Sequence, residues 1–454
     1  MKMKNIKIIG SYITQFGELW DKSLESLFAE AVFGSLRSVQ DTKDLTQDVA
    51  ENVIKNINVT ENNLDKKTVS NSRFKAEQID AVFVANMASG QFANQLHLNA
   101  LVSQMLPHNP PAFRVEAACA SGGMALELAE LSLLSGKYKT VLVVGAEKMT
   151  DVFSGEASQI LSGASEYQKE YGSTFPALYA LFAQAHMKEF GTTRAQLSAV
   201  ASKNHTHALS NPKAQFRKEI PEAVISKSSM IADPLRLFDC SPVSDGAAAV
   251  ILTTKNLKKY AHKPVIAGVG HAQDTLNLAE RKTVLELSAT VQAAQQAYQQ
   301  AGITPQDIMF AEVHDCFTIA EILATEDLGF FEKGTGGSAV AEGRTTYQKK
   351  TDQFSVVINP SGGLKACGHP VGATGVKQVA FLAQLLEATA TKNADAQNIE
   401  QTTNQKTNGN IHQNTVIGSQ KKKQKKLHGL THNVGGSGAT AIVHIISQEY
   451  IQSI

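Results

Sequence analysis

Residues 113–148 constrain the fold of this chain more than any other segment does. The segment predicts, in order, an apolar strand, a sharp turn of small residues, an apolar helix at about 120–135 and a second strand; it reads FRVEAACASGGMALELAELSLLSGKYKTVLVVGAEK. The helix carries Met124 and several leucines nearly all round, which predicts burial on every side. The strand KTVLVVGAE is continuously apolar, as is typical of a parallel strand covered on both faces. The segment therefore predicts a βαβ unit within an α/β fold.

The second half of the chain repeats the pattern of the first. TPQDIMFAEVHDCFT (304–318) matches AEQIDAVFVANMAS (76–89), because each has a polar turn, an isoleucine and a strand that runs into a loop. Residues 354–387 match residues 113–136, because each segment has a strand, a Gly-rich turn and an apolar helix; residues 354–387 read FSVVINPSGGLKACGHPVGATGVKQVAFLAQLLE. Two similar halves would bring their corresponding loops together at one central site.

Other segments interrupt or end this repeat. Residues 150–235 predict a helical insertion in the first half, before a strand at 245–254. Residues 40–76 are polar and predict a surface excursion with one helical turn. Residues 389–426 are rich in Asn, Gln and Thr and end in KKKQKK, which predicts a loop outside the finished fold. A nucleic-acid role is the alternative for the lysine run. Residues 429–446 predict a Gly-rich turn followed by a strand.

The composition excludes several classes of protein. Lys plus Arg number 43 and Asp plus Glu 42, so a net charge of +1 provides no basic field for nucleic acid. No apolar run approaches the roughly 20 residues that a membrane span needs. The N-terminus lacks the apolar region of a signal peptide, and the final IQSI does not match a peroxisomal address. These features favour a cytoplasmic location.

Four widely separated cysteines, Cys119, Cys240, Cys316 and Cys367, predict neither a disulfide framework nor a zinc site. Cys119 is the strongest candidate nucleophile, because it follows a strand and opens a helix whose N-terminal partial positive charge favours the thiolate. The small residues around it leave room for a substrate beside the sulfur. A small buried core cysteine is the alternative interpretation.

Three further segments carry groups that could complete a site with Cys119. His369 lies in CGHPVGATG, a loop fixed by proline and glycines, and a histidine near a cysteine can take its proton. A structural loop histidine is the alternative. His314, Asp315 and Cys316 end an apolar strand, where sites form in α/β sheets, although Asp315 could be a simple turn residue. HNVGGSG (432–438) offers backbone N–H groups for an oxyanion, with a plain tight turn as the alternative.

Taken in order, these segments resemble those of the thiolase family, specifically its sterol-carrier-protein type. EAACASGG resembles the family's nucleophile segment, NPSGGLKACGHPVGATG its GHP segment, AEVHDCF the HDCF block of this type, and HNVGGSG its C-terminal turn. PLRLFDCSPVSDGAAAVIL (234–252) resembles the segment that closes the family's first half. The resemblance covers nearly the whole chain outside 40–75 and 389–426.

The resemblance implies the α/β thiolase fold, with two similar βαβαβαββ halves packed as α-β-α-β-α layers. The N-terminal half would span 1–262 and hold a helical loop domain at about 150–240. The C-terminal half would span 263–454 and hold the HDCF, GHP and HNVGG segments. The implied activity is reversible Claisen condensation or CoA-dependent thiolytic cleavage of 3-oxoacyl-CoA, as in acetyl-CoA acetyltransferase or 3-ketoacyl-CoA thiolase.

The resemblance also implies a role for each site residue. Cys119 would attack the thioester and carry the acyl group, and His369 would remove the thiol proton. Cys316 would take a proton from the α-carbon of the second acyl-CoA. His314 would join His369 around the enolate oxygen, and the backbone N–H groups of Cys119 and Gly435 would form a second oxyanion hole.

The expected ligands are acyl-CoA and CoA, with no metal and no redox cofactor, and Ser241 lies where the family contacts the pantetheine arm. The resemblance implies a homodimer or a tetramer. Some relatives work with a small zinc-ribbon/OB-fold partner and a hydroxymethylglutaryl-CoA synthase. One position departs from the family: typical thiolases carry a base cysteine where this chain has Asn433, so the base role rests on Cys316.

Two other functions stay open at this point. A decarboxylating ketoacyl synthase-like condensing enzyme would also use Cys119 with two histidines, but it would not need Cys316, because decarboxylation itself creates the carbanion. A thiolase-like chain that only binds acyl-CoA, or serves as a scaffold, would have lost a catalytic residue, whereas this chain keeps all four. If the chain is a thiolase, acetoacetyl-CoA and short acyl chains are the favoured substrates.

Overall fold

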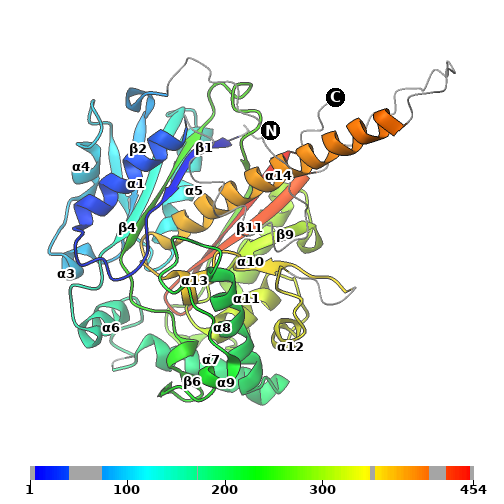
Figure 1. The fold of residues 1–454 in the computed structure, drawn as a ribbon. Helices are drawn as coiled ribbons and strands as arrows, with labels where there is room; N and C mark the ends of the chain where they lie inside the picture. Colours follow the sequence, from blue (N-terminus) through cyan, green and yellow to red (C-terminus); the bar gives the residue numbers. More distant parts are fainter. Residues whose placement is uncertain (1–5, 40–73, 171, 348–352, 408–425, 450–454) are drawn as a thin grey trace.

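The computed structural model describes residues 6–39, 74–170, 172–347, 353–407 and 426–449. Within these ranges ten strands form one mixed sheet, and helices cover both of its faces (Figure 1). The strands are β1 Ile6–Ile13, β2 Ala81–Ala85, β3 Ala112–Val115, β4 Thr140–Glu147, β7 Gly246–Thr253, β8 Val265–Gln273, β9 Ile308–Glu312, β10 Val357–Ile358, β11 Lys426–Gly435 and β12 Thr440–Glu449.

The order of the strands confirms the internal repeat. The first half runs β3-β2-β4-β7-β1 and the second β10-β9-β11-β12-β8, so each half places its five strands in the same order. The pairing directions also match: β2 is parallel to β3 and β4, as β9 is to β10 and β11, and the remaining pairs are antiparallel. A short antiparallel contact of β1 with β8, at Ile6–Ile266 and Lys7–Val265, joins the halves. The predicted boundary at 262/263 falls in the β7–β8 connection and stays a prediction.

Two long helices form the middle layer of the molecule, as predicted for α-β-α-β-α packing. Helix α5 (Ser121–Leu134) contacts β2 and β4 of the first half and β11 and β12 of the second. Helix α14 (Thr374–Thr407) contacts β1 and β7 as well as β11 and β12, and it crosses the centre of the view in Figure 1. On the outer faces, α1 (Leu24–Ser38) packs on β1, β4 and β7, and α10 (Ser288–Ala301) packs on β8 and β12.

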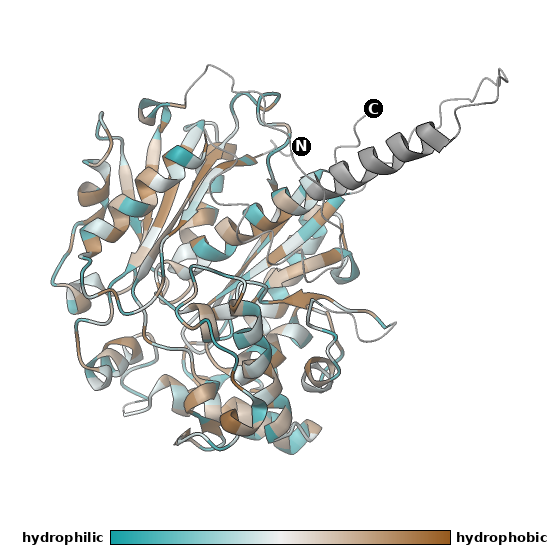
Figure 2. Cartoon of the chain, in the orientation of Figure 1, coloured by the Kyte–Doolittle hydropathy of each residue, from teal (hydrophilic) through white to brown (hydrophobic). Residues whose placement is uncertain are grey.

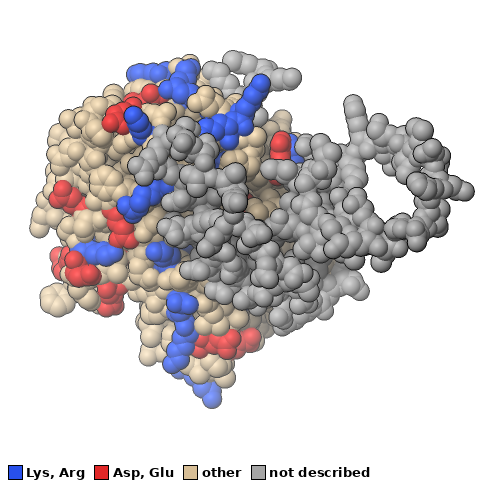
Figure 3. Space-filling view, turned by 45° about the horizontal axis from the view of Figure 1, so that its top comes forward, with Lys and Arg blue, Asp and Glu red and all other residues tan. Residues whose placement is uncertain are grey.

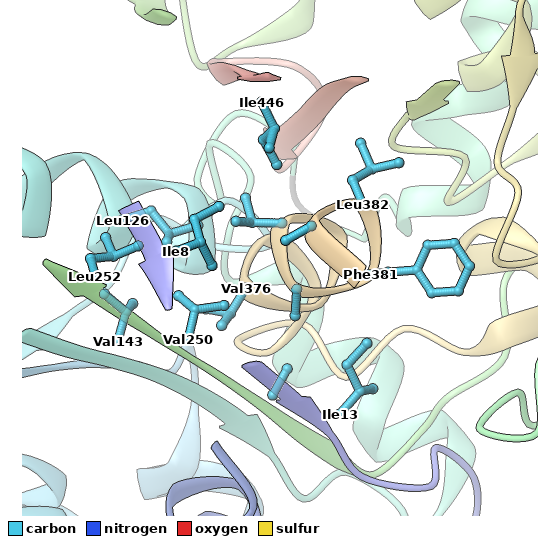
Figure 4. Packing of buried hydrophobic residues seen from close by; sticks show 14 of the residues in the cluster. Ile8, Ile13, Leu126, Val143, Val250, Leu252, Val376, Phe381, Leu382 and Ile446 are labelled. Carbon is cyan, nitrogen blue, oxygen red and sulfur yellow. The ribbon is translucent and has the colours of Figure 1, made fainter. Parts of the chain in front are cut away.

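The largest core cluster lies around this middle layer. Its buried side chains come from α5, α14 and strands of both halves, as Figure 4 shows for Leu126, Val376, Val143, Val250 and Ile446. The apolar residues concentrate on the strands and inner helix faces, while the outer helices are mixed (Figure 2). On the face in Figure 3, the described acidic and basic side chains are interspersed, as the near-zero net charge leads one to expect.

The helical insertion is confirmed and gathers at one end of the sheet (Figure 1). It contains α6 Ser154–Ser162, α7 Phe175–Phe190, α8 Arg194–Ala208 and α9 Glu222–Ile225, with a hairpin of β5 Met230–Ala232 and β6 Leu235–Arg236. The second half contributes α11 Thr318–Asp327, α12 Gly336–Ala341 and α13 Gly363–Cys367, and the first half adds α3 Ser89–Phe92 and α4 Leu98–Ser103. Short 3₁₀ turns precede β2 and β9, at Ala76–Gln78 and Pro305–Asp307, another trace of the repeat.

The structure corrects three expectations. Helix α5 is not buried on every side, because Leu128 and Leu131 are 39% and 54% exposed beside the edge of the sheet. Residues 389–407 are not a loop: α14 continues to Thr407, because a helix already nucleated extends at little cost through Ala, Gln, Lys and Glu. Residues 429–435 belong to β11 rather than to a turn, and only the tip of the β11–β12 hairpin turns.

Most of the excursion predicted at 40–76, namely residues 40–73, and the lysine run before Lys426 lie outside the described residues. None of the described helices combines the length and the apolar character needed to cross a bilayer.

Candidate active site

The turn that carries Cys119 connects β3 to the start of α5. Ala118 has φ 53°, a left-handed conformation that costs a non-glycine residue about 1–3 kcal/mol. Ser121 holds the turn closed, because its hydroxyl donates to the Ala118 carbonyl (2.6 Å) and accepts from the Ala117 N–H (3.0 Å). Cys119 is 9% exposed and lies just before the N-terminus of α5, as the sequence analysis predicts.

The N-termini of α5 and α14 meet at this point, and glycine makes the contact feasible. A Cβ on Gly122 would lie 2.8 Å from the Gly375 nitrogen, and a Cβ on Gly375 would lie 2.3 Å from the Gly123 nitrogen. Because His369 precedes α14 as Cys119 precedes α5, the close approach brings the two residues together. Equivalent loops of the two halves thus form one site, as the repeat predicts.

Three of the predicted site residues converge closely. The Cys119 Sγ and one ring nitrogen each of His314 and His369 lie within 4.8 Å of one another. The two imidazole rings are edge to face, with centroids 5.0 Å apart at 84°. Cysteine sulfur and histidine nitrogen also bind zinc, so these three side chains are a candidate metal site among the described residues. The same proximity allows proton transfer between the groups.

Cys316, the fourth predicted residue, borders this cluster from the loop after β9. Its pKa is raised by burial and, to a smaller extent, by the charge of the neighbouring Cys119. The Ser241 N–H donates to the Cys316 carbonyl at 2.9 Å, so the structure places Ser241 beside the site. The tip of the β11–β12 hairpin closes another side, where the backbone N–H of Gly436, next to Gly435, hydrogen-bonds the Cys119 sulfur.

The hydrogen bonds of His369 indicate which ring nitrogen is free. Its backbone N–H donates to Ser244 Oγ (2.9 Å), and its Nδ1 lies 2.7 Å from Thr374 Oγ1. Since the Thr374 hydroxyl donates to the Pro370 carbonyl (3.1 Å), its oxygen is free to accept from Nδ1–H. His369 Nε2 then carries the lone pair, as a base that takes the Cys119 proton requires.

Burial sets the charge state of the site. It raises the pKa of Cys119 to about 12, although the Gly436 N–H opposes the shift, and it raises the pKa of Cys316 well above the usual range. Burial likewise lowers the pKa of His369 to about 3 and that of His314 well below its usual value. Burial of the Cys119 thiol therefore opposes the preference for a thiolate that the helix N-terminus provides. All four groups rest neutral at pH 7.

Asp315 anchors the site loop instead of facing the cluster. It is fully buried and accepts hydrogen bonds from Asn204 Nδ2 (2.7 Å) and from the N–H groups of Leu364 (2.6 Å) and Lys365 (3.2 Å). It thereby ties the loop after β9 to α13. Burial and the nearby Glu321 raise the pKa of Asp315 to about 7.

Sequence reasoning missed several groups that contact the site. The Tyr179 hydroxyl, from α7 of the helical insertion, hydrogen-bonds the Cys316 thiol and donates to the Gly436 carbonyl at 3.2 Å. Arg281 donates to the Ser437 carbonyl (2.7 Å) and so fixes the hairpin tip. Asn433 was noticed only as a departure, yet its amide contacts both Cys119 and His314. No motif marks Tyr179, a tyrosine on an otherwise ordinary apolar helix.

The chain matches two family models and named relatives over most of its length. The family model "Thiolase, N-terminal domain" matches residues 8–256, and "Thiolase C-terminal domain-like" matches 270–420. The chain is 38% identical over 449 residues to the acetyl-CoA acetyltransferase of Methanothermobacter thermautotrophicus, which covers 98% of this chain and 100% of the relative. It is 35% identical to sterol carrier protein 2 of Oryctolagus cuniculus, over 62% of this chain and 54% of the relative.

Solved structures share the fold at low sequence identity. The "Ltp2-ChsH2(DUF35) aldolase" superposes with a TM-score of 0.70 at 18% identity, covering 98% of both chains. Human mitochondrial 3-ketoacyl-CoA thiolase in complex with CoA superposes with a TM-score of 0.63 at 16% identity, again over 98% of both chains. The solved structures share the fold, and the two family models together with the relative that is 38% identical over its full length show that the chain belongs to the thiolase family.

Proposed function

We propose that this protein is an acyltransferase that forms and cleaves the carbon–carbon bond of 3-oxoacyl-CoA through an acyl group carried on Cys119. The observation that carries the proposal is the convergence of Cys119, His314 and His369 in a buried site, with Cys316 beside them. The full-length similarity to proteins named acetyl-CoA acetyltransferase supports acetoacetyl-CoA as the first substrate to try.

In the cleavage direction, His369 Nε2 takes the Cys119 proton as the sulfur attacks the 3-oxo carbon. The bond between C2 and C3 then breaks, and its electron pair forms the enolate of the departing acyl-CoA. Cys316 gives its proton to C2. His369 then passes its proton to the Cys316 thiolate. Free CoA gives its thiol proton to His369 and attacks the acyl-Cys119 thioester, and the sulfur of Cys119 leaves and takes that proton from His369. Condensation is the same sequence in reverse.

Both anions that form on this route need donors, because the reacting groups are largely buried. We assign the enolate oxygen to His314 and His369, and the tetrahedral oxyanion to the N–H groups of Cys119 and Gly435. Each fixed donor contributes about 3–4 kcal/mol in comparable oxyanion holes. A thiolate–imidazolium pair of Cys119 and His369 keeps the net charge of the site unchanged, so each charge offsets part of the desolvation cost of the other.

The test is to mix purified protein with acetoacetyl-CoA and CoA and to follow the loss of the enolate absorbance. Rapid loss in the wild type, with none in Cys119→Ala or Cys316→Ala, is the expected result. Cys367→Ala is the matched control, because Cys367 is a buried cysteine outside the cluster, and it should keep most of the activity.

Other outcomes of this assay lead elsewhere. Activity that survives in Cys316→Ala would place the base on another group. If the wild type is inactive with acetoacetyl-CoA and also with longer and branched 3-oxoacyl-CoA, the acyl-CoA-binding scaffold becomes the better interpretation.

We also propose that the protein is a homodimer built on the β3 edge of the sheet. Phe113 on this strand is 42% exposed, and β3 contacts α5, the helix that carries the exposed Leu128 and Leu131. Light scattering after size exclusion should show a dimer that Leu131→Glu weakens, whereas Leu181→Glu, at an equally exposed leucine of α7, should not. The expected small zinc-ribbon/OB-fold partner stays a prediction, to be checked by co-purification.

A further inference from the structure

The side chain of Asn433 joins three parts of the active site. Its Oδ1 accepts from the Gly123 N–H at 2.9 Å, in the first turn of α5. Its Nδ2 lies 3.0 Å from the Cys119 carbonyl oxygen and 3.3 Å from His314 Nδ1. At 1% exposure the amide has no access to bulk water, so these partners define its hydrogen bonding.

The chemistry of these partners fixes the orientation of the amide. A backbone N–H can only donate and a carbonyl can only accept, so the oxygen of Asn433 must face Gly123 and the nitrogen must face Cys119. The second amide proton is then directed at His314 Nδ1. The Val434 N–H, at 3.4 Å, also faces that nitrogen. His314 Nδ1 is therefore surrounded by donors and must act as an acceptor.

An imidazole that is neutral and accepts at Nδ1 carries its proton on Nε2. His314 is neutral because burial holds its pKa well below the usual value. Repulsion from His369 and His432, which can also take up a positive charge, lowers the pKa further. His314 Nε2 is buried and has no hydrogen-bond partner in the described protein. A buried donor without a partner costs about 1–3 kcal/mol, a cost that an oxygen of the substrate would remove.

We propose that Asn433 is a positioning residue that holds His314 as the tautomer with its proton on Nε2, and so presents a permanent donor to the enolate oxygen. The role of the donor rests on the proposed function. Typical thiolases carry a base cysteine at this position, and an amide cannot take a proton. Asn433, which stands where typical thiolases have the cysteine, therefore cannot transfer a proton and instead fixes the tautomer of the neighbouring His314.

The first test is spectroscopic and needs no substrate. The ¹⁵N shifts of labelled histidine distinguish a protonated ring nitrogen from an unprotonated one, and the signals missing in His314→Gln identify His314. We expect Nδ1 unprotonated in the wild type. In Asn433→Asp, measured at a pH high enough to ionise the buried carboxyl, the carboxylate can only accept, and the proton should appear on Nδ1. The buried amide of Asn211, which donates to the Ser361 carbonyl at 2.9 Å, provides the matched control Asn211→Asp, in which the His314 signals should stay in place.

The second test separates enolate formation from acyl transfer. Exchange of the α-protons of acetyl-CoA with D₂O requires the enolate, whereas exchange of labelled CoA into acetyl-CoA requires only the acyl-Cys119 step. Loss of one oxyanion donor reduces a rate by about 100-fold or more, so Asn433→Asp should slow α-proton exchange by about that factor and CoA exchange by much less.

A double variant keeps the proposal falsifiable if Asn433→Asp also disturbs the Cys119 turn. The glutamine of His314→Gln offers an N–H₂ near the position of Nε2, and it has no tautomers. In that background Asn433→Asp should slow α-proton exchange by far less than it does in the wild type. An equal effect in both backgrounds, or a wild-type proton on Nδ1, would overturn the proposal. A wild type that is inactive in thiolysis but has its proton on Nε2 would refute only the proposed function.

Discussion

Replacing Tyr179 with phenylalanine tests how a thiol with a strongly raised pKa can act as a base. Burial and the nearby Cys119 raise the pKa of Cys316, while the Tyr179 hydroxyl lowers it. In the resting site this hydroxyl donates to the Gly436 carbonyl at 3.2 Å. When Cys316 becomes a thiolate, the same proton can turn to the sulfur. Tyr179→Phe therefore removes a donor that acts on the Cys316 sulfur only once the thiolate has formed.

The expected magnitude follows from the strength of one hydrogen bond to a charged group, about 1.5–3 kcal/mol. At about 1.4 kcal/mol per factor of ten, α-proton exchange of acetyl-CoA should slow by roughly 10- to 150-fold. The fold should tolerate the change, because the phenyl ring can keep the stacking of Tyr179 on Phe317, whose centroids are 4.6 Å apart. Labelled CoA exchange, which does not use Cys316, should change little.

The pH profile gives a second, independent readout. Without the hydroxyl, the pKa of Cys316 rises further, so the increase of α-proton exchange with pH should move to higher pH. Tyr298→Phe is the matched control, since Tyr298 is also buried and its hydroxyl donates to the Leu328 carbonyl at 2.9 Å. The reasoning fails if Tyr179→Phe slows both exchanges equally, or if it changes neither more than the control does.

Further predictions concern the frame around the site. Lys377→Met should lower the free energy of unfolding by about 3–5 kcal/mol in urea, because it leaves Glu312 buried without its partner at 2.8 Å; adding Glu312→Gln should recover part of that loss. Gly375→Ala should abolish thiolysis and lower the melting temperature, since its Cβ would lie 2.3 Å from Asn433 Oδ1; an active, stable variant would contradict the packing. Burial raises the pKa of Glu147 from 4.5 to about 7, so folded protein binds that proton more tightly than unfolded protein does. Wild type should therefore lose roughly 3 kcal/mol relative to Glu147→Gln as pH rises from about 4 to 7, and parallel stability curves would disprove the shift.

The main features of the fold were predictable because hydrophobic patterns report burial directly. The continuous apolar run in 140–147 predicts a central strand, and the repeated turn–strand–loop pattern at 76–89 and 304–318 predicts equivalent positions in two halves. The failures have one common cause: a pattern shows that a residue is apolar or polar, but not what covers it. Leu131 is apolar and yet exposed in the single chain, and the polar residues from 389 onward extend α14 because the helix before them is already formed.

The positions of the site residues were easier to predict than their state of charge. Cys119 and His369 each lie in a turn that precedes a helix, α5 and α14, so a Gly-rich turn in the sequence was enough to place them. The same local argument favours a thiolate at Cys119, but it does not include the burial that raises the pKa of this thiol to about 12 in the folded chain.

The donors that compensate for this burial are equally non-local: the Gly436 N–H approaches Cys119 from the β11–β12 hairpin, and Tyr179 approaches Cys316 from the helical insertion. A site of neutral, desolvated groups must create charge only when substrate supplies a counterpart. The residues that regulate this step are therefore the neighbours of the motifs rather than the motifs themselves. Asn433 and Tyr179, which no motif singles out as catalytic, are accordingly where substitution should separate enolate chemistry from acyl transfer.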